Sequence, residues 1–236
     1  MSLTLSSATF EAFAVQVRAS WAERTALQLH STYPDYFTAL DVTSEDLVPL
    51  CQQVERFAAR HEVTGEREVF RLILVAISMG HRFWQDPRFH GYVANSLGNV
   101  DIVPSRRALA MVNSGKTWLR LLWNDDDLGA FADRLTKHLR SNAITGADAI
   151  RSILPRHWQI ISTADNQRLI DWLSRSPSPE RFRAPYQKLG NLACALVHGV
   201  HWASDPQYPV LASAIDNADD ARDLADRLAA IYGRMI

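Results

Sequence analysis

Cysteine is scarce in this chain: its 236 residues include only Cys51 and Cys194. Each lies in an apolar, periodic segment, where a free thiol usually behaves as a small buried hydrophobic group. A chain of this length can bury a substantial core without disulfides, and unpaired cysteines are typical of a reducing compartment. We therefore expect both thiols to lie in the core of a cytoplasmic protein.

Long apolar runs are also absent. The longest one, Leu72–Met79, is interrupted by Ser78 and ends at Gly80, well short of the roughly 18 to 20 residues that a membrane helix needs. The first residues, MSLTLSSATFEAF, have no basic stretch before an apolar one, so they do not resemble a secretory signal. We expect a soluble protein that makes no contact with a membrane.

Neither sign of charge is in excess, because 25 basic residues oppose 26 acidic ones. This balance gives no general attraction to phosphate backbones. A local group of Arg106, Arg107, Lys116 and Arg120 is followed directly by three aspartates at 125–127, and we interpret it as a solvated charged face. No nucleic-acid partner is expected.

Catalytic motifs are missing as well. The segment NSGKTW (113–118) resembles the end of a phosphate-binding loop, but Ala110 stands where the first glycine of that motif belongs, and a predicted helix precedes it. No Gly-x-Ser-x-Gly, His-Glu-x-x-His or Cys-x-x-Cys pattern occurs. We expect no enzyme activity and no cofactor.

Helical periodicity is abundant. The segment 44–61 places its apolar residues on one stripe, and Thr43 with Asp46 forms a capping pattern at its start. A helix at 8–30 places Phe10, Phe13, Val17 and Trp21 on one side. Core positions are predicted at Leu47, Leu50, Val54, Phe57, Leu72, Ile73, Leu192, Leu196, Leu224 and Leu228.

The remaining helices follow from caps, prolines and glycines. Further helices are predicted at 66–80, 88–96, 104–123, 127–140, 145–155, 163–174, 185–199 and 219–232. The best candidate strand, WQIIS at 158–162, is too short and isolated to build a sheet. The sequence thus predicts an all-α fold, a helical bundle of about 9–11 helices.

One pattern occurs twice. GHRFWQDPRFHGYV (80–93) and GVHWASDPQYPVLA (199–212) each place Asp-Pro six residues after a glycine, with an aromatic residue three positions before the aspartate and another three after it. The residues in these positions are Gly80, Phe83, Asp86, Pro87 and Phe89 in the first copy, and Gly199, Trp202, Asp205, Pro206 and Tyr208 in the second. This repeat suggests two related halves, 1–100 and 101–236, which can pack as one domain.

A structural interpretation explains the glycine, aspartate and proline together. Gly80 and Gly199 suit a helix end that needs a left-handed residue, and each aspartate can cap a short helix that the proline begins. The alternative is a small metal-binding protein or enzyme that uses the nearby histidines, which are His81, His90, His198 and His201. Their spacing argues against a metal, because the Asp-Pro stop separates His81 from His90 and His201 has no counterpart in the first copy.

The stretch 61–87, HEVTGEREVFRLILVAISMGHRFWQDP, resembles small helical proteins of unassigned activity that are encoded in bacterial type VI secretion loci. In that family a segment like Ser-Glu-Arg-Asp-Val, here 65–69, precedes an apolar helix that is followed by Gly, two residues, Phe and Asp-Pro, here Gly80, Phe83 and Asp86-Pro87. Trp84 departs from the pattern, which usually has an aspartate there. The resemblance covers about residues 10–95.

This resemblance implies a cytoplasmic immunity or accessory protein that binds a secreted effector encoded nearby, and it transfers no catalytic residue. Arginine and large aromatic residues most often dominate the energy of protein interfaces. We therefore expect the partner to contact residues beside the two turns: Arg82, Trp84, Arg88, Trp202 and Tyr208.

Overall fold

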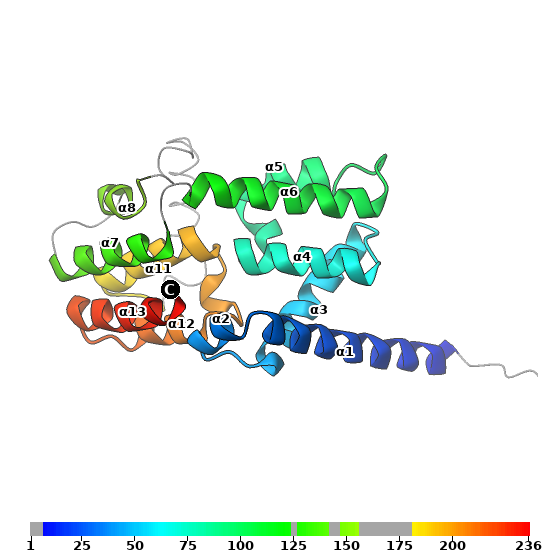
Figure 1. Ribbon diagram of the computed structural model, residues 1–236, viewed down its shortest axis with the longest axis horizontal. Coiled ribbons are helices and arrows are strands. Elements are labelled where there is room, and N and C mark those ends of the chain that lie inside the picture. Colours follow the sequence, from blue (N-terminus) through cyan, green and yellow to red (C-terminus); the bar gives the residue numbers. More distant parts are fainter. Residues whose placement is uncertain (1–6, 124–126, 142–146, 156–180) are drawn as a thin grey trace, which may run out of the picture.

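The computed structural model has the all-α fold that the sequence predicts (Figure 1). It describes residues 7–123, 127–141, 147–155 and 181–236. Within these ranges lie eleven α-helices and three short 3-10 helices, no strand, and no helix long and apolar enough to span a bilayer. The candidate strand at 158–162 and the predicted helix at 163–174 lie outside the described residues.

Most helix ends fall within a few residues of the prediction. The elements are α1 (Ser7–Thr32), α2 (Pro34–Ala39), α3 (Ser44–Arg60), α4 (Glu66–Met79), η1 (Phe83–Gln85), η2 (Pro87–Phe89), α5 (His90–Ser96), α6 (Pro104–Trp123), α7 (Leu128–Ser141), α8 (Ala147–Ile153), α11 (Pro185–His198), η3 (Trp202–Ser204), α12 (Pro209–Asp216) and α13 (Ala221–Met235). The short helices α2 and α12 were not predicted. Each begins with a proline. A proline can end the segment before it, but its fixed φ also suits the first turn of a new helix.

The start of α3 shows why these ends are predictable. The Asp46 amide donates to the Thr43 hydroxyl at 3.3 Å, and the Thr43 amide donates to the Asp46 carboxylate at 2.8 Å. This reciprocal capping box satisfies two amides that the helix itself leaves without partners. The hydrogen bonds from Thr43 lower the pKa of Asp46. The predicted cap is therefore confirmed.

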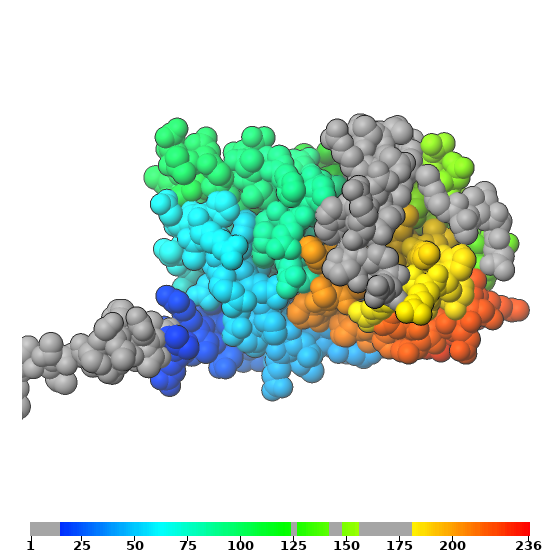
Figure 2. Space-filling model, turned by 180° about the vertical axis from the view of Figure 1, so that it is seen from behind, coloured from blue at the N-terminus to red at the C-terminus, as the bar shows by residue number. Residues whose placement is uncertain are grey.

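The helices on either side of residue 100 share one core. In the N-terminal part α1 packs on α3, and α4 packs between α3 and α6, while in the C-terminal part α7 packs on α13. Although α6 begins just after the predicted boundary, it lies against α4, which precedes it. Seen from behind, the segment around η3 and α12 adjoins α3 and α5 (Figure 2). That two related halves exist stays a prediction.

The predicted core is largely confirmed. Nine of the ten predicted positions are buried, and Leu192 is partly buried. The prediction for α1 is confirmed at Trp21, which is buried, and is wrong at Val17, which is 48% exposed. The side chains of Phe10 and Phe13 lie outside the described residues. The face of α1 that packs on the body carries Ala22, Ala26 and Leu29, and Val17 lies off the line through these residues.

One charged residue of the predicted solvated face is buried. Arg106, Lys116 and Arg120 are exposed, whereas Arg107 is only 2% exposed. The Arg107 guanidinium donates to the carbonyl oxygen of Leu97 and to the carboxylate of Glu62, both at 3.1 Å. It therefore ties α6 to the connection between α3 and α4, a role that charge patterning along a helix does not reveal.

Candidate functional site

The two repeated segments lie against each other at the centre of the molecule. We call residues 80–89 the first turn and residues 199–208 the second turn. Gly80 and Gly199 both have a φ of 94°, a conformation that favours glycine. A Cβ atom on Gly199 would lie 2.7 Å from the carbonyl oxygen of Met79. The glycines thus permit both the left-handed helix ends and the close approach of the two backbones.

The two turns share their backbone hydrogen bonds as well as their sequence pattern. The amide of Phe83 donates to the carbonyl oxygen of Gly80 at 3.1 Å, and the amide of Trp202 donates to the carbonyl oxygen of Gly199 at 3.0 Å. A 3-10 helix then leads to the aspartate in each turn, η1 in the first and η3 in the second. The local sequence pattern therefore dictates the same local conformation at two distant places in the chain.

The aspartates have related but different roles. Asp86 caps η2, because its carboxylate accepts the amide of Arg88 at 3.0 Å. Asp205 accepts the amide of Gln207 at 3.0 Å, but a turn follows it where a helix was predicted. Its second oxygen accepts the amide of His81 at 2.9 Å. Asp205 thus caps its own turn and also binds the first turn, where it accepts the amide of His81.

Arg88 is a structural cross-link in this structure. Its side chain is 4% exposed, and its guanidinium pairs with Asp86 at 2.6 Å and donates to the carbonyl oxygens of Leu196 at 2.7 Å and Ala195 at 3.1 Å. A cation is favoured there because the last carbonyl groups of α11 lack helical partners. With every one of these contacts inside the protein, the expectation that Arg88 contacts a partner is corrected.

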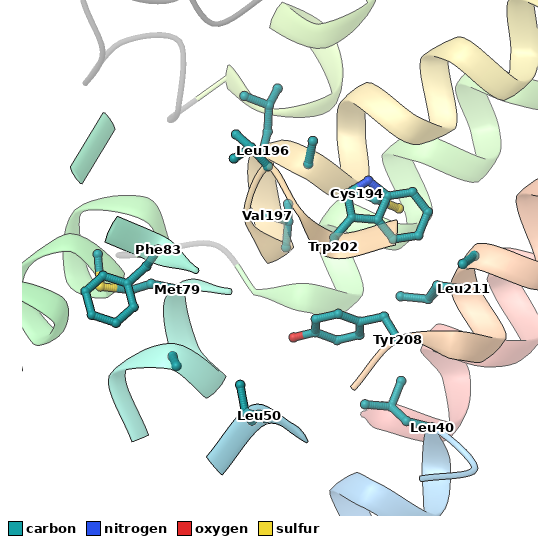
Figure 3. Close-up of a cluster of buried hydrophobic side chains, with 14 of the residues drawn as sticks. Leu40, Leu50, Met79, Phe83, Cys194, Leu196, Val197, Trp202, Tyr208 and Leu211 are labelled. Atoms are coloured by element: carbon teal, nitrogen blue, oxygen red, sulfur yellow. The ribbon is translucent and has the colours of Figure 1, made fainter. Parts of the chain in front are cut away.

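Trp202 and Tyr208 are buried, at 1% and 3% exposure. Trp202 stacks on Phe182 and donates its indole N–H to the side chain of Asn191 at 3.0 Å. The Tyr208 hydroxyl points away from Leu211 and toward the side of the cluster where Met79 lies (Figure 3). Neither ring is on the surface, which corrects the expectation that these two residues contact a partner.

Arg82 and Trp84 remain accessible, because both are only partly buried. Trp84 stacks face to face on Phe57 at 4.1 Å between ring centroids, with an interplanar angle of 6°. Arg82 has a left-handed backbone (φ 59°) and donates from Nε to the side chain of Gln53 at 3.2 Å. Since Gln53 and Phe57 are one helical turn apart, the two side chains lie along the same face of α3.

The histidines do not form a ligand set. His90 is exposed, whereas His81 and His198 are buried. His81 and His201 face each other edge to face at 6.0 Å, and the Nδ1 atom of His81 lies 3.2 Å from the Asp205 carboxylate, although not aligned for a hydrogen bond. Among the described residues, no group of three or more His, Cys, Asp or Glu side chains is arranged to hold a metal ion.

Burial keeps two histidines and both cysteines uncharged at neutral pH. Burial lowers the pKa of His198 to about 4, and burial with nearby His81 and Arg82 lowers that of His201 to about 4. Both are therefore neutral at pH 7. Burial also raises the pKa of Cys51 and Cys194 to about 12. A thiol with such a pKa provides almost no thiolate for nucleophilic attack.

A buried network of tyrosines was missed by the sequence analysis. The hydroxyl groups of Tyr36 and Tyr208 lie 3.1 Å apart, and Tyr232 lies 3.0 Å from Nε2 of His198. Burial raises the pKa of Tyr36 to about 12 and raises that of Tyr208 well above its ordinary value. These residues come from α2, α11, α13 and the second turn, so no local motif could have joined them.

No protein-family model, curated protein or solved structure matches this chain. We infer the function from the geometry of the paired turns and from the surface beside them.

Proposed function

We propose that this protein is a non-catalytic binding protein that holds a type VI secretion effector in the cytoplasm of the producing cell, as an immunity or accessory protein. The observation that carries the proposal is the pair of accessible side chains, Arg82 and Trp84, that the first turn presents on α3. The resemblance of residues 61–87 to proteins of type VI secretion loci supplies the biological context.

The pair has the properties of an interface anchor. Tryptophan and arginine are enriched among residues whose truncation weakens binding most. Trp84 is held by its stack on Phe57, and Arg82 by its hydrogen bond to Gln53, so little side-chain entropy remains to be lost on association. The left-handed backbone of Arg82, with a φ of 59°, costs free energy, and such strain is common at functional sites.

Binding also suits the state of the chemically reactive groups. Both cysteines and two of the histidines near the turns have pKa values far from neutrality because they are buried. The carboxylates of Asp86 and Asp205 are hydrogen-bonded inside the protein. Selective binding needs only shape and charge complementarity on a stable scaffold, and the paired turns provide that scaffold.

The test is co-expression with the product of the adjacent gene, followed by purification of the complex and calorimetric titration. We expect Arg82→Ala and Trp84→Ala each to weaken binding about tenfold or more. A Val100→Ser/Val103→Ser variant is the matched control, because these exposed residues lie on the connection between α5 and α6, away from the first turn. We expect this control to bind like the wild type.

The outcomes separate the alternatives. A complex together with rescue of a cell poisoned by the effector identifies an immunity protein, and a complex without rescue identifies a loading chaperone. Loss of binding in the Val100/Val103 control alone would transfer the contact surface to that connection and overturn the assignment to Arg82 and Trp84. No complex at all would refute the proposed function.

A further inference from the structure

A pocket of about 430 Å³ lies where the second turn meets α2, α4, α6 and the start of α7. Most of its wall is apolar, from Ile77, Leu119, Trp123, Leu128 and Val197. Its size falls within the roughly 300 to 1,000 Å³ of pockets that bind small molecules. It is distinct from the surface formed by Arg82 and Trp84, neither of which lines it.

The tyrosine pair leaves one hydrogen-bond donor free at this pocket. Tyr36 and Tyr208 both line it, and their hydroxyl groups are 3.1 Å apart, so one donates to the other. Each hydroxyl has one proton to donate, and the described residues offer no second acceptor to either oxygen. Whichever tyrosine donates within the pair, the other retains an O–H that is free to bond a ligand.

The electrostatics of the pocket select against an anion. No lysine or arginine occurs among the described residues that line it. His198, which also lines it, is neutral at pH 7 because burial lowers its pKa to about 4. Asp127 is the one acidic side chain among the described residues that line the pocket, and burial raises the pKa of both tyrosines, with a smaller contribution from the charge of Asp205. An anionic ligand would therefore lose its hydration without gaining a cation from the described lining.

We propose that this pocket binds an uncharged, largely apolar ring compound that carries one hydrogen-bond acceptor, such as an aryl ketone, with the acceptor on the free hydroxyl of the Tyr36–Tyr208 pair. The apolar wall buries the ring, and the donor fixes its orientation. This inference is independent of the effector that the protein binds.

Three probes of similar shape test the chemistry by ligand-observed NMR titration of the full chain. Acetophenone carries a neutral acceptor, ethylbenzene carries none, and benzoate carries a charged one. We expect acetophenone to bind about three- to tenfold more tightly than ethylbenzene, the effect of one added hydrogen bond. Benzoate should bind more weakly than acetophenone by about tenfold or more, because the described lining offers its charge no lysine or arginine.

Two variants locate the site. Tyr36→Phe/Tyr208→Phe removes both hydroxyl groups while keeping the rings, a change that is often nearly neutral for stability, and it should abolish the preference for acetophenone over ethylbenzene. Ser78→Trp, at an exposed lining position of α4, should block binding of both probes. Thr117→Trp, at an exposed position of α6 outside the lining, should leave binding unchanged.

The proposal is overturned by no binding of acetophenone to the wild type, by benzoate binding as tightly as acetophenone, or by an unchanged preference in the double tyrosine variant. Binding that persists in Ser78→Trp would show that the probes occupy another place, which also overturns it.

Discussion

The Cα atom of Gly80 lies 3.0 Å from the position that a Cβ atom on Gly199 would occupy. The two residues have the same left-handed φ of 94° and come from turns that are 119 positions apart. This contact joins the N-terminal helices to the C-terminal ones.

Gly199→Ala should destabilise the protein by about 2 kcal/mol or more, because the added methyl group meets backbone atoms of the first turn and the left-handed φ disfavours alanine. Gly233→Ala is the control. Gly233 lies inside α13 with open space around it, and alanine there should stabilise the protein by about 0.5 to 1 kcal/mol. Urea unfolding measures both changes, and equal effects would contradict the close contact.

Asp86→Ala should cost about 3 to 5 kcal/mol, because it leaves the buried Arg88 without its counter-charge. The loss of a helix cap alone costs only about 0.5 to 2 kcal/mol. Asp220→Ala provides that comparison, since Asp220 is an exposed cap of α13. The double variant Asp86→Ala/Arg88→Met should recover much of the loss in chemical denaturation. A loss no larger than that of Asp220→Ala would show that Arg88 is not held by this pair.

Stability should fall as the pH decreases from about 6.5 to about 4. Unfolded His198 takes up a proton near pH 6.5, whereas burial lowers its folded pKa to about 4. In this window protons bind the unfolded state more strongly and so favour unfolding, by up to about 1.4 kcal/mol per pH unit for one group. His198→Gln should reduce the slope of unfolding free energy against pH in this window. A slope equal to that of the wild type would argue against a buried neutral His198.

Arg82→Gly should leave stability nearly unchanged, because relief of the left-handed backbone offsets the lost hydrogen bond to Gln53. If the proposed function is right, the same change should weaken binding of the proposed effector, so a loss of binding would not be a result of a loss of stability. Asp41→Gly is the matched control, with a similar φ of 52° on an exposed residue. It should stabilise the protein slightly and leave binding intact. Tight binding by Arg82→Gly would remove Arg82 from the interface.

The sequence by itself determined most of the helices and the helix ends at the two turns. Thr43 and Asp46 satisfy each other's amides within four positions, and Gly80 and Gly199 end their helices through their own φ. Caps, prolines and glycines act on atoms a few residues away, so their effect can be read locally. The same holds for Asp86, which caps the helix that Pro87 begins.

Only the tertiary structure decided which residues beside the turns are accessible. Trp84 lies one position beyond the place that Trp202 occupies in the repeat, and it stacks on α3 at the surface, whereas Trp202 is enclosed beside Phe182. The Arg88 side chain is buried because the C-terminal end of α11 packs against it. The tyrosine hydroxyl groups meet because α2 packs against the second turn. Burial depends on which elements pack against a residue, and no pattern within its own segment records that.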